Sequence, residues 1–357
     1  MKETKGGGVT AIIPARNEEA NIARVVRSVA AQEGILEILV VDDQSQDRTG
    51  EILNGLKAEI PALRTVRIDS LPEGWTGKSY AVTAAARMAA GEWLLFTDAD
   101  TEHLPGSLAA LLERAESEGA DLLSVSPGQR TPTWWEKAVI PLVYVHLAGL
   151  YRFEDVSNPH SPAAAANGQY VLIRREAYER AGGHEAVRGE ILEDVELARR
   201  VKASGGRLLF LPGAAWVQTR MYQSFFDMWR GWTKNLYLLY AMSLTRMFRT
   251  VLEVWLIDVL PTAGFLVLCA LVALGRGGVA TILATVGCFV IAVLRQWRYS
   301  QALDRIGFEP RLASFQVLGA GLFGLLLLSS VRAYCWGGKV EWKGREYPTQ
   351  GSTKGTR

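Results

Sequence analysis

Short apolar runs alternate with helical patterns over the first hundred residues. Residues 9–13 (VTAII), 35–41 (ILEILVV) and 93–97 (WLLFT) are apolar runs of the length that a buried parallel strand takes. Apolar side chains at helical spacing predict a helix over Asn21–Gln32, and the Ala-rich segment Ser79–Ala90 is also typical of a helix. Strands that alternate with helices predict an α/β fold with an open, mostly parallel sheet.

The hydrophobic pattern changes after residue 250. Val254–Leu274 is apolar apart from Asp258, and neither Gly277–Leu294 nor Leu312–Val331 carries a charge. Each segment is near the roughly 20 residues that a helix needs to cross a bilayer. Three such helices inside a soluble core would leave little amphipathic surface to face water, so we predict about three membrane helices. The predicted divisions are an α/β domain, a membrane region and a polar tail, at residues 1–250, 251–335 and 336–357.

The distribution of charge and of polar segments bears on location. Met1–Gly8 is polar and predicts no signal peptide, so we expect a multi-pass protein of the cytoplasmic (inner) membrane with its catalytic domain in the cytosol. Residues 295–311 and the tail from Arg332 are both basic, which favours the cytosolic side for both, yet one crossing by Leu312–Val331 would separate them. The aromatic segment Trp134–Phe153 fits either an interfacial helix or a helix packed under the domain. The net charge of +2 predicts no surface for nucleic acid.

Each of the three N-terminal apolar runs ends in polar or acidic residues. Pro14–Glu19, Asp42–Asp47 and Asp98–Asp100 follow the first, second and third run. Because ligands of open α/β sheets bind at the carboxyl ends of the strands, these segments predict a functional site at one edge of the sheet.

The acidic pairs in these segments allow specific chemistry. Asp98 and Asp100 can hold Mg²⁺ or Mn²⁺, which would neutralise a leaving diphosphate, although such a pair alone is also typical of a solvated turn. Asp42 and Asp43 can accept hydrogen bonds from a base or a ribose. Asp47 stands where a helix through Leu56 would be capped, as Asn21 does for the preceding helix.

A further acidic pair lies later in the chain. Glu193 and Asp194 stand at the predicted start of a helix. A carboxylate there can take a proton from an acceptor hydroxyl, but acidic residues also favour the first turn of any helix. The local sequence does not separate these two interpretations.

Together these segments resemble the inverting glycosyltransferases of family two, which have the GT-A fold, from about Val9 to about Tyr240. Pro14–Glu19 is similar to the family's nucleotide-binding loop, and Val41–Thr49 to its VDDxSxDxT signature. Asp98–Asp100 is similar to its DxD motif, and Glu193-Asp194 to the ED pair that supplies its base. The resemblance therefore implies a Rossmann-like GT-A domain followed by transmembrane helices.

A narrower resemblance concerns the acceptor. Gly74–Lys78, Asn167–Tyr170 and Trp342–Tyr347 are similar to segments of glycosyltransferases associated with hopanoids and carotenoids. Ceramide glucosyltransferases are more distant relatives. One departure stands out, because no Arg-Trp pair follows Gln223 at the spacing of the QxxRW motif of many processive relatives. Arg230 and Trp232 are the candidates for a related role.

The resemblance implies transfer of a sugar from a nucleotide diphosphate sugar, with UDP-sugars favoured, to a hydroxyl of an isoprenoid, hopanoid, carotenoid or sphingolipid-like membrane lipid. It makes Asp194 the general base. The donor-binding residues would be Pro14, Arg16, Glu18, Asp42, Asp43, Lys78 and Asp98. The metal ligands would be Asp100 and Asp98. Acceptor or pocket residues would be Glu193, Gln169, Arg230 and Trp232. Apart from the resemblance, His103 lies close to Asp98–Asp100 in the sequence and is expected to line the pocket.

Two alternatives stay open. A polyprenyl-phosphate acceptor would need no strong base and would favour extra Arg or Lys near the pocket. A non-catalytic membrane transporter or sensor that binds nucleotide sugars would need no base at Asp194 and would place polar groups along its spans, where only Asp258 is present.

Overall fold

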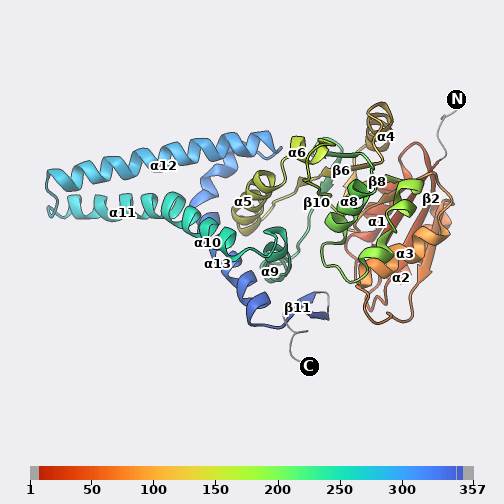
Figure 1. Ribbon diagram of the computed structural model, residues 1–357. Helices are drawn as coiled ribbons and strands as arrows, with labels where there is room; N and C mark the ends of the chain where they lie inside the picture. Colours follow the sequence, from red (N-terminus) through yellow and green to blue (C-terminus); the bar gives the residue numbers. More distant parts are fainter. Residues whose placement is uncertain (1–7, 343, 349–357) are drawn as a thin grey trace, which may run out of the picture. The chain divides into compact units, whose positions relative to one another are not determined.

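The computed structural model describes residues 8–342 and 344–348 (Figure 1). They form two compact units, which we describe separately. The first contains the chain up to Arg130 and Tyr151–Met221, and the second contains Thr131–Leu150 and the chain from Tyr222 onward. These units follow contacts between residues, whereas the divisions predicted above follow hydropathy.

A seven-stranded sheet forms the centre of the first unit, in the order β3-β2-β1-β4-β8-β6-β9. Only β8 runs antiparallel to its neighbours, so the prediction of a mostly parallel sheet is confirmed. The strands are β1 (Val9–Ala15), β2 (Ile35–Asp42), β3 (Leu63–Arg67), β4 (Trp93–Phe96), β6 (Leu122–Ser126), β8 (Val171–Arg174) and β9 (Leu208–Pro212). A second sheet joins β5 (Thr101–His103), β10 (Val217–Thr219) and β7 (Gly128–Gln129).

Helices cover both faces of the large sheet. Side chains alternate along β1, so Ile13 packs with α1 on one face while Ile12 packs with α3 and α8 on the other. Both residues are fully buried, which explains why the strand is an uninterrupted apolar run. The helices of this unit are α1 (Ile22–Ala30), α2 (Thr49–Glu59), α3 (Gly77–Met88), α4 (Ser107–Ser117), α6 (Phe153–Ser157), α7 (Arg175–Arg180), η1 (His184–Val187) and α8 (Glu193–Ala203).

The register of the parallel strands brings the polar segments to one edge. Ala15 at the end of β1 pairs with Asp42 at the end of β2, and Ile12 pairs with Phe96 at the end of β4. The segments after these three strands therefore leave the sheet at the same edge, as the sequence predicts.

Neither predicted N-cap acts as expected. Asn21 occupies the N-cap position of α1, but its side chain bonds the side chains of Glu18 and Arg24 and accepts no backbone N–H. The N-cap of α2 is Arg48, and the Asp47 carboxylate accepts the Thr49 N–H at 3.0 Å from one position earlier. The charged side chains of Glu18 and Arg24 thus take the hydrogen bonds of Asn21, whereas Asp47 accepts the Thr49 N–H and hydroxyl together with the Glu19 N–H.

The second unit is mainly helical. Its elements are α5 (Trp134–Leu150), α9 (Phe225–Leu239), α10 (Leu244–Glu253), the π-helix η2 (Val254–Val259), α11 (Leu260–Ala273), α12 (Val279–Arg305), the 3₁₀ helix η3 (Pro310–Phe315), α13 (Gln316–Cys335), and the hairpin of β11 (Lys339–Trp342) and β12 (Arg345–Pro348). Within the described chain, three continuous helical segments are long and apolar enough to cross a membrane: Leu244–Ala273, Val279–Arg305 and Pro310–Cys335.

Two features of this unit differ from the expectations. α12 continues to Arg305, so most of the basic segment after residue 294 is helical rather than a loop. The segment predicted over Trp134–Phe153 divides at Leu150, where α5 ends before α6 begins.

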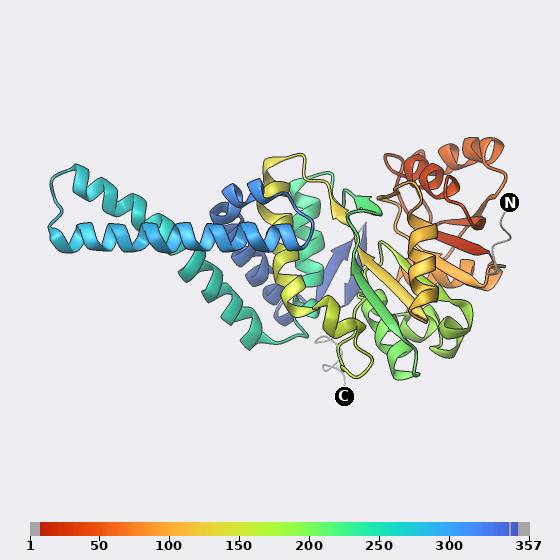
Figure 2. The same cartoon turned by 90° about the horizontal axis from the view of Figure 1, so that it is seen from above.

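The motif around Gly344 occupies the turn between β11 and β12, and its Lys343 lies outside the described residues. Figures 1 and 2 both show α11 and α12 side by side as a helical hairpin.

Candidate active site

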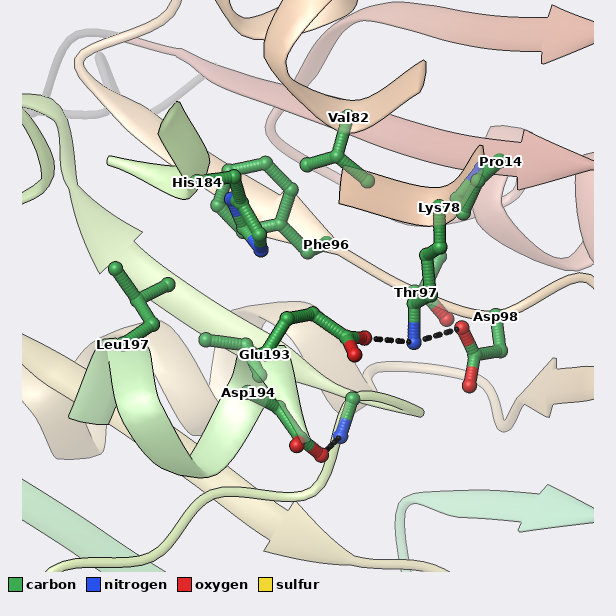
Figure 3. Close-up of a pocket in the computed structure, with 12 residues that line it drawn as sticks. Pro14, Lys78, Val82, Phe96, Thr97, Asp98, His184, Glu193, Asp194 and Leu197 are labelled. Atoms are coloured by element: carbon green, nitrogen blue, oxygen red, sulfur yellow. Dashed lines mark hydrogen bonds and ion pairs between the residues drawn. The ribbon is translucent and has the colours of Figure 1, made fainter. Parts of the chain in front are cut away.

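A pocket opens at the carboxyl edge of the large sheet in the first unit (Figure 3). The ends of β1 and β4, the start of α3, the loop before β8 and the start of α8 all contribute to its wall. Its lining residues are Pro14, Lys78, Val82, Phe96, Thr97, Asp98, Gly168, Val171, His184, Glu193, Asp194 and Leu197.

Lys78 lies at the amino end of α3, where the Thr76 hydroxyl caps the helix by accepting the Ser79 N–H. Its ammonium group bridges two carboxylates, at 2.7 Å from Asp98 Oδ1 and 2.8 Å from Glu193 Oε1. Burial by itself would lower the pKa of Lys78, but the nearby carboxylates raise it well above its usual value. The side chain is therefore always protonated and supplies a positive charge at a helix amino end, where anions bind favourably.

Asp194 stands in the first turn of α8 and points into the pocket beside Glu193. Its Oδ2 accepts the Gly168 N–H at 2.6 Å, and its Oδ1 accepts the Val195 N–H at 2.8 Å. Burial and the charge of Glu193 raise the pKa of Asp194 to about 6, against the opposing effects of Lys78 and the two N–H groups. Such a carboxylate is ionised at neutral pH yet is a stronger base than an exposed aspartate.

Glu193 differs from Asp194 although the two are adjacent. Its carboxylate is buried and forms the ion pair with Lys78. Burial would raise the pKa of Glu193, but the charge and hydrogen bond of Lys78 lower it overall. The pair thus contains one carboxylate held as an anion and one available to exchange a proton.

Gly168 is needed where Asp194 and Lys78 meet. A Cβ atom at this position would lie 2.7 Å from Lys78 Nζ and 3.2 Å from Asp194 Oδ2. This glycine lies in the motif Asn167–Tyr170, but the motif alone predicts no role for it. Its importance depends on α3 and α8, which approach it from distant parts of the sequence, so no local signal identifies it.

The segments after β1 and β2 are tied together by hydrogen bonds. Arg16 Nη1 donates to the Asp43 carbonyl at 2.9 Å, and the Glu18 N–H donates to Thr49 Oγ1 at 2.8 Å. Asp42 is buried, and its Oδ1 accepts the Ser45 N–H at 2.9 Å. These predicted donor-binding residues share one corner of the sheet edge, and Pro14 lines the pocket itself.

The two residues proposed as metal ligands lie in the turn after β4. Asp98 lines the pocket, whereas Asp100 is not among the lining residues, and its backbone carbonyl accepts from Thr219 Oγ1 at 3.2 Å. No group of three or more His, Cys, Asp or Glu side chains gathers as a metal site among the described residues. Two carboxylates nevertheless fit Mg²⁺ or Mn²⁺, since these ions take their remaining oxygen ligands from water and phosphate.

Several polar residues near the pocket lie behind its wall. His103, expected to line the pocket, is not among the lining residues and is buried behind Thr97, with 3.0 Å between His103 Nε2 and Thr97 Oγ1. Gln169 is also buried, and its backbone carbonyl accepts from Thr97 Oγ1 at 2.9 Å. His184 does line the pocket, and burial lowers its pKa to about 4, so its ring is neutral. No motif in the sequence predicts this position for His184.

Arg230 and Trp232 belong to α9 of the second unit. Trp232 is buried and packs edge-on against Tyr144 and Tyr222, while Arg230 is exposed. Their predicted role in acceptor binding stays a prediction.

Comparison with known proteins finds a family model that part of this chain matches. Residues 10–182 match the family model described as "Glycosyl transferase family 2". A 4,4'-diaponeurosporenoate glycosyltransferase of Staphylococcus aureus is 27% identical over 345 residues, which cover 95% of this chain and 88% of the relative. The enzyme of the same description from Staphylococcus haemolyticus is 28% identical over 239 residues, which cover 64% of this chain and 60% of the relative.

A solved structure supports the fold. The mannosyltransferase PcManGT from Pyrobaculum calidifontis, in complex with GDP-Man and Mn²⁺, superposes with a TM-score of 0.55. It is 19% identical, and the match covers 90% of this chain and 88% of that chain. The predicted GT-A fold is confirmed, and the predicted family-two resemblance is confirmed over residues 10–182, which match the glycosyltransferase family 2 model.

Proposed function

We propose that this glycosyltransferase moves a sugar from a nucleoside diphosphate sugar, preferably a UDP-sugar, to a hydroxyl group of a membrane lipid, with inversion at the anomeric carbon. One observation carries the proposal. In a single pocket, Lys78 bridges Asp98 and Glu193, and Asp194 stands beside them with a raised pKa. The arrangement combines a positive group for a diphosphate with a base for an acceptor.

The donor would lie across the edge of the sheet. Arg16, Glu18, Asp42 and Asp43 would surround the nucleoside, because their segments converge after β1 and β2. Lys78 would contact the diphosphate from the amino end of α3. The similar mannosyltransferase was solved with GDP-Man, so the preference for the nucleotide base should be tested with both UDP- and GDP-sugars.

Asp98 and Asp100 would hold a divalent cation, Mg²⁺ or Mn²⁺. The similar mannosyltransferase was solved with Mn²⁺, and the two carboxylates are hard oxygen ligands. When bound, the ion supplies positive charge to the departing diphosphate. Lys78, already 2.7 Å from Asp98, would add to that charge.

Asp194 would act as the general base. It takes the proton of the acceptor hydroxyl, whose oxygen forms a bond to the anomeric carbon while the bond from that carbon to the diphosphate oxygen breaks. One such displacement inverts the anomeric centre. The Gly168 and Val195 N–H groups hold both oxygens of Asp194, which fixes the direction of the carboxylate.

The acceptor class rests on two observations. The relatives are described as 4,4'-diaponeurosporenoate glycosyltransferases, and this chain has three helices of membrane-spanning length. An enzyme attached to the bacterial inner membrane, with its catalytic domain in the cytosol, would meet an isoprenoid, hopanoid, carotenoid or sphingolipid-like acceptor at a high local concentration. A polyprenyl-phosphate acceptor is already anionic and would need no general base at Asp194. The position of Asp194 in the pocket therefore favours a hydroxyl acceptor.

The test is a nucleotide-release assay with the full-length chain in detergent or lipid vesicles. UDP- and GDP-sugars are supplied with and without a bacterial lipid extract, and lipid products are identified by mass spectrometry. We expect release that depends on the lipid extract, together with a glycosylated neutral lipid. Release with no lipid product, or binding with no release, would contradict the proposal, and a glycosylated polyprenyl phosphate would identify the alternative acceptor.

A further inference from the structure

The three apolar segments of the second unit differ in what surrounds them. In the most apolar window of Pro310–Cys335, half of the residues are buried within the protein. The corresponding figures are 11% for Leu244–Ala273 and 0% for Val279–Arg305. All three segments are strongly apolar, yet one is covered by protein and the other two have apolar side chains that face outward.

α13 is covered by α5 and α9. A Cβ atom at Gly319 would lie 2.1 Å from the Ala138 carbonyl oxygen, so the backbones of α13 and α5 meet at this point. Buried Ser330 donates to the Thr233 carbonyl at 2.6 Å and accepts the Tyr237 N–H at 2.9 Å. These contacts make α13 a core helix of the unit, and its apolar sequence is explained by burial in protein.

α11 and α12 form the opposite case. Pro261 is the only buried residue of α11 within the described structure, and α12 buries only Tyr299 and Leu303, near its carboxyl end. Large apolar side chains along both arms are more than half exposed, among them Leu266, Val267, Leu274, Val279, Leu283, Val286 and Leu294. A surface of this extent and composition matches lipid hydrocarbon rather than water.

A polar cluster marks the base of this hairpin. Asp258 Oδ1 accepts from Arg295 Nε at 2.8 Å and from Gln316 Nε2 at 3.0 Å. Each of the three apolar segments thus contributes one member, and the Asp258 side chain is only 2% exposed. The pairing neutralises the charge of Arg295, which would otherwise be costly beside hydrocarbon.

The distance from the cluster to the tip of the hairpin fits a bilayer. Val259–Leu274 and Val279–Leu294 contain 16 residues each. At about 1.5 Å per residue, each arm is about 24 Å long. That is slightly less than the roughly 30 Å of hydrocarbon, and a bilayer adapts to a short span by thinning locally or by snorkelling of flanking side chains. Arg276, exposed in the turn between the arms, would reach the far headgroups.

We propose that α11 and α12 cross the bilayer as a two-pass hairpin, and that α13 does not cross but stays in the protein on the side where both arms begin and end. The chain then crosses twice after Asp258. This number places the basic segment around Arg305 and the chain after Arg332 on one side, as the positive-inside tendency favours for both. The inference is independent of the sugar and of the acceptor.

The test is cysteine labelling from each side of the membrane, with the full chain in right-side-out and inverted vesicles. Cys335 is the last residue of α13 and is exposed, so it is retained as a natural probe while Cys269 and Cys288 are replaced by Ala. In the background that also lacks Cys335, single probes are introduced as Glu309→Cys between α12 and α13, Arg276→Cys at the tip and Leu283→Cys in the first half of the α12 arm. Gly278→Cys provides a second tip probe, because an added Cβ meets no atom within 4 Å there.

An impermeant maleimide should label Cys335 and Glu309→Cys from the same side and both tip probes from the opposite side. Leu283→Cys should label from neither side until detergent is added. Labelling of Cys335 and Glu309→Cys from opposite sides would show that α13 crosses and would overturn the proposal. Tip labelling from the same side as Cys335 would also overturn it, because the hairpin would then not reach the far face. Donor-dependent nucleotide release by each variant shows that it is folded, and its loss in all variants would bear on the proposed function instead.

Discussion

The exchange Asp194→Asn separates catalysis from helix structure at the candidate base. Both carboxylate oxygens of Asp194 accept backbone N–H groups, from Gly168 at 2.6 Å and from Val195 at 2.8 Å. Asparagine keeps one acceptor oxygen and places an NH₂ group against the other N–H. The substitution therefore removes the base and also leaves one of these hydrogen bonds unmade.

The two effects differ in size. Loss of a general base typically reduces the rate about 10²–10⁴-fold, which corresponds to about 3–5 kcal/mol. An unsatisfied buried N–H costs about 1–3 kcal/mol of folding free energy. The asparagine is neutral, however, and avoids the cost of burying a charge that is reflected in the raised pKa of Asp194. These opposing effects on folding should leave the melting temperature only slightly changed, while transfer falls by at least about a hundredfold.

The assay combines sugar transfer to a lipid extract, donor titration by calorimetry and thermal unfolding. Glu196→Gln is the matched control, because Glu196 is a first-turn acid of the same helix but pairs with Arg199 outside the pocket. We expect the control to transfer normally and Asp194→Asn to bind the donor without transfer. Transfer near the wild-type rate would make Asp194 a structural residue only, and a collapse of donor affinity would assign it to the nucleotide site.

Four other predictions follow from the same structure. Gly168→Ala should reduce transfer without unfolding the chain, because its Cβ would displace Lys78 or Asp194; a normal rate would refute this requirement for glycine. Asp100→Ala, or excess chelator, should abolish transfer while the fold persists in circular dichroism, and full activity in chelator would exclude a required metal. Transfer measured as kcat/KM should rise with pH through about 6 as Asp194 ionises. The contribution of Asp194 to the free energy of unfolding should fall as the pH rises from about 4 to about 6, because the folded state binds more protons than the unfolded state in this pH range. The full chain should stay in the membrane pellet after high-salt and carbonate washes, and recovery in the soluble fraction would argue against spanning helices.

The sequence predicted the strands closest to the site because their burial is nearly uniform. β1 and β2 are covered on both faces, so an apolar run and the strand coincide to within two residues. The cap position at Asn21 was predicted correctly, but its side chain bonds Glu18 and Arg24 instead of a backbone N–H, and the cap predicted at Asp47 lies one residue too early. The antiparallel direction of β8 was not predicted either, since pairing between distant strands leaves little trace in local periodicity.

The residues of the site likewise divide into those that local motifs predict and contacts that join distant segments. Asp98, Glu193 and Asp194 were predicted from short motifs at strand and helix ends, and they line one pocket. The bridge that Lys78 makes between Asp98 and Glu193 was not predicted, because it joins α3, β4 and α8 across more than a hundred residues. In the membrane region, hydropathy could not distinguish α13 from α11 and α12, because burial in protein and burial in lipid select the same side chains.

The balance of charge in the pocket supports the proposed cation. Asp98, Glu193 and Asp194 surround one ammonium group, that of Lys78, so these four residues carry a net negative charge when Asp194 is ionised. A donor diphosphate would bring further negative charge to the same place. Two unit charges about 5 Å apart interact by about 3 kcal/mol at an effective dielectric constant of about 20, so the diphosphate would be repelled unless a cation accompanied it. A divalent ion at Asp98 and Asp100 would reverse that balance, and the same ion would leave Lys78 free to move from Asp98 toward the diphosphate. Donor affinity should therefore fall with chelation in the wild type and respond less to chelation in Asp98→Asn, where both the ligand and one repelling charge are removed.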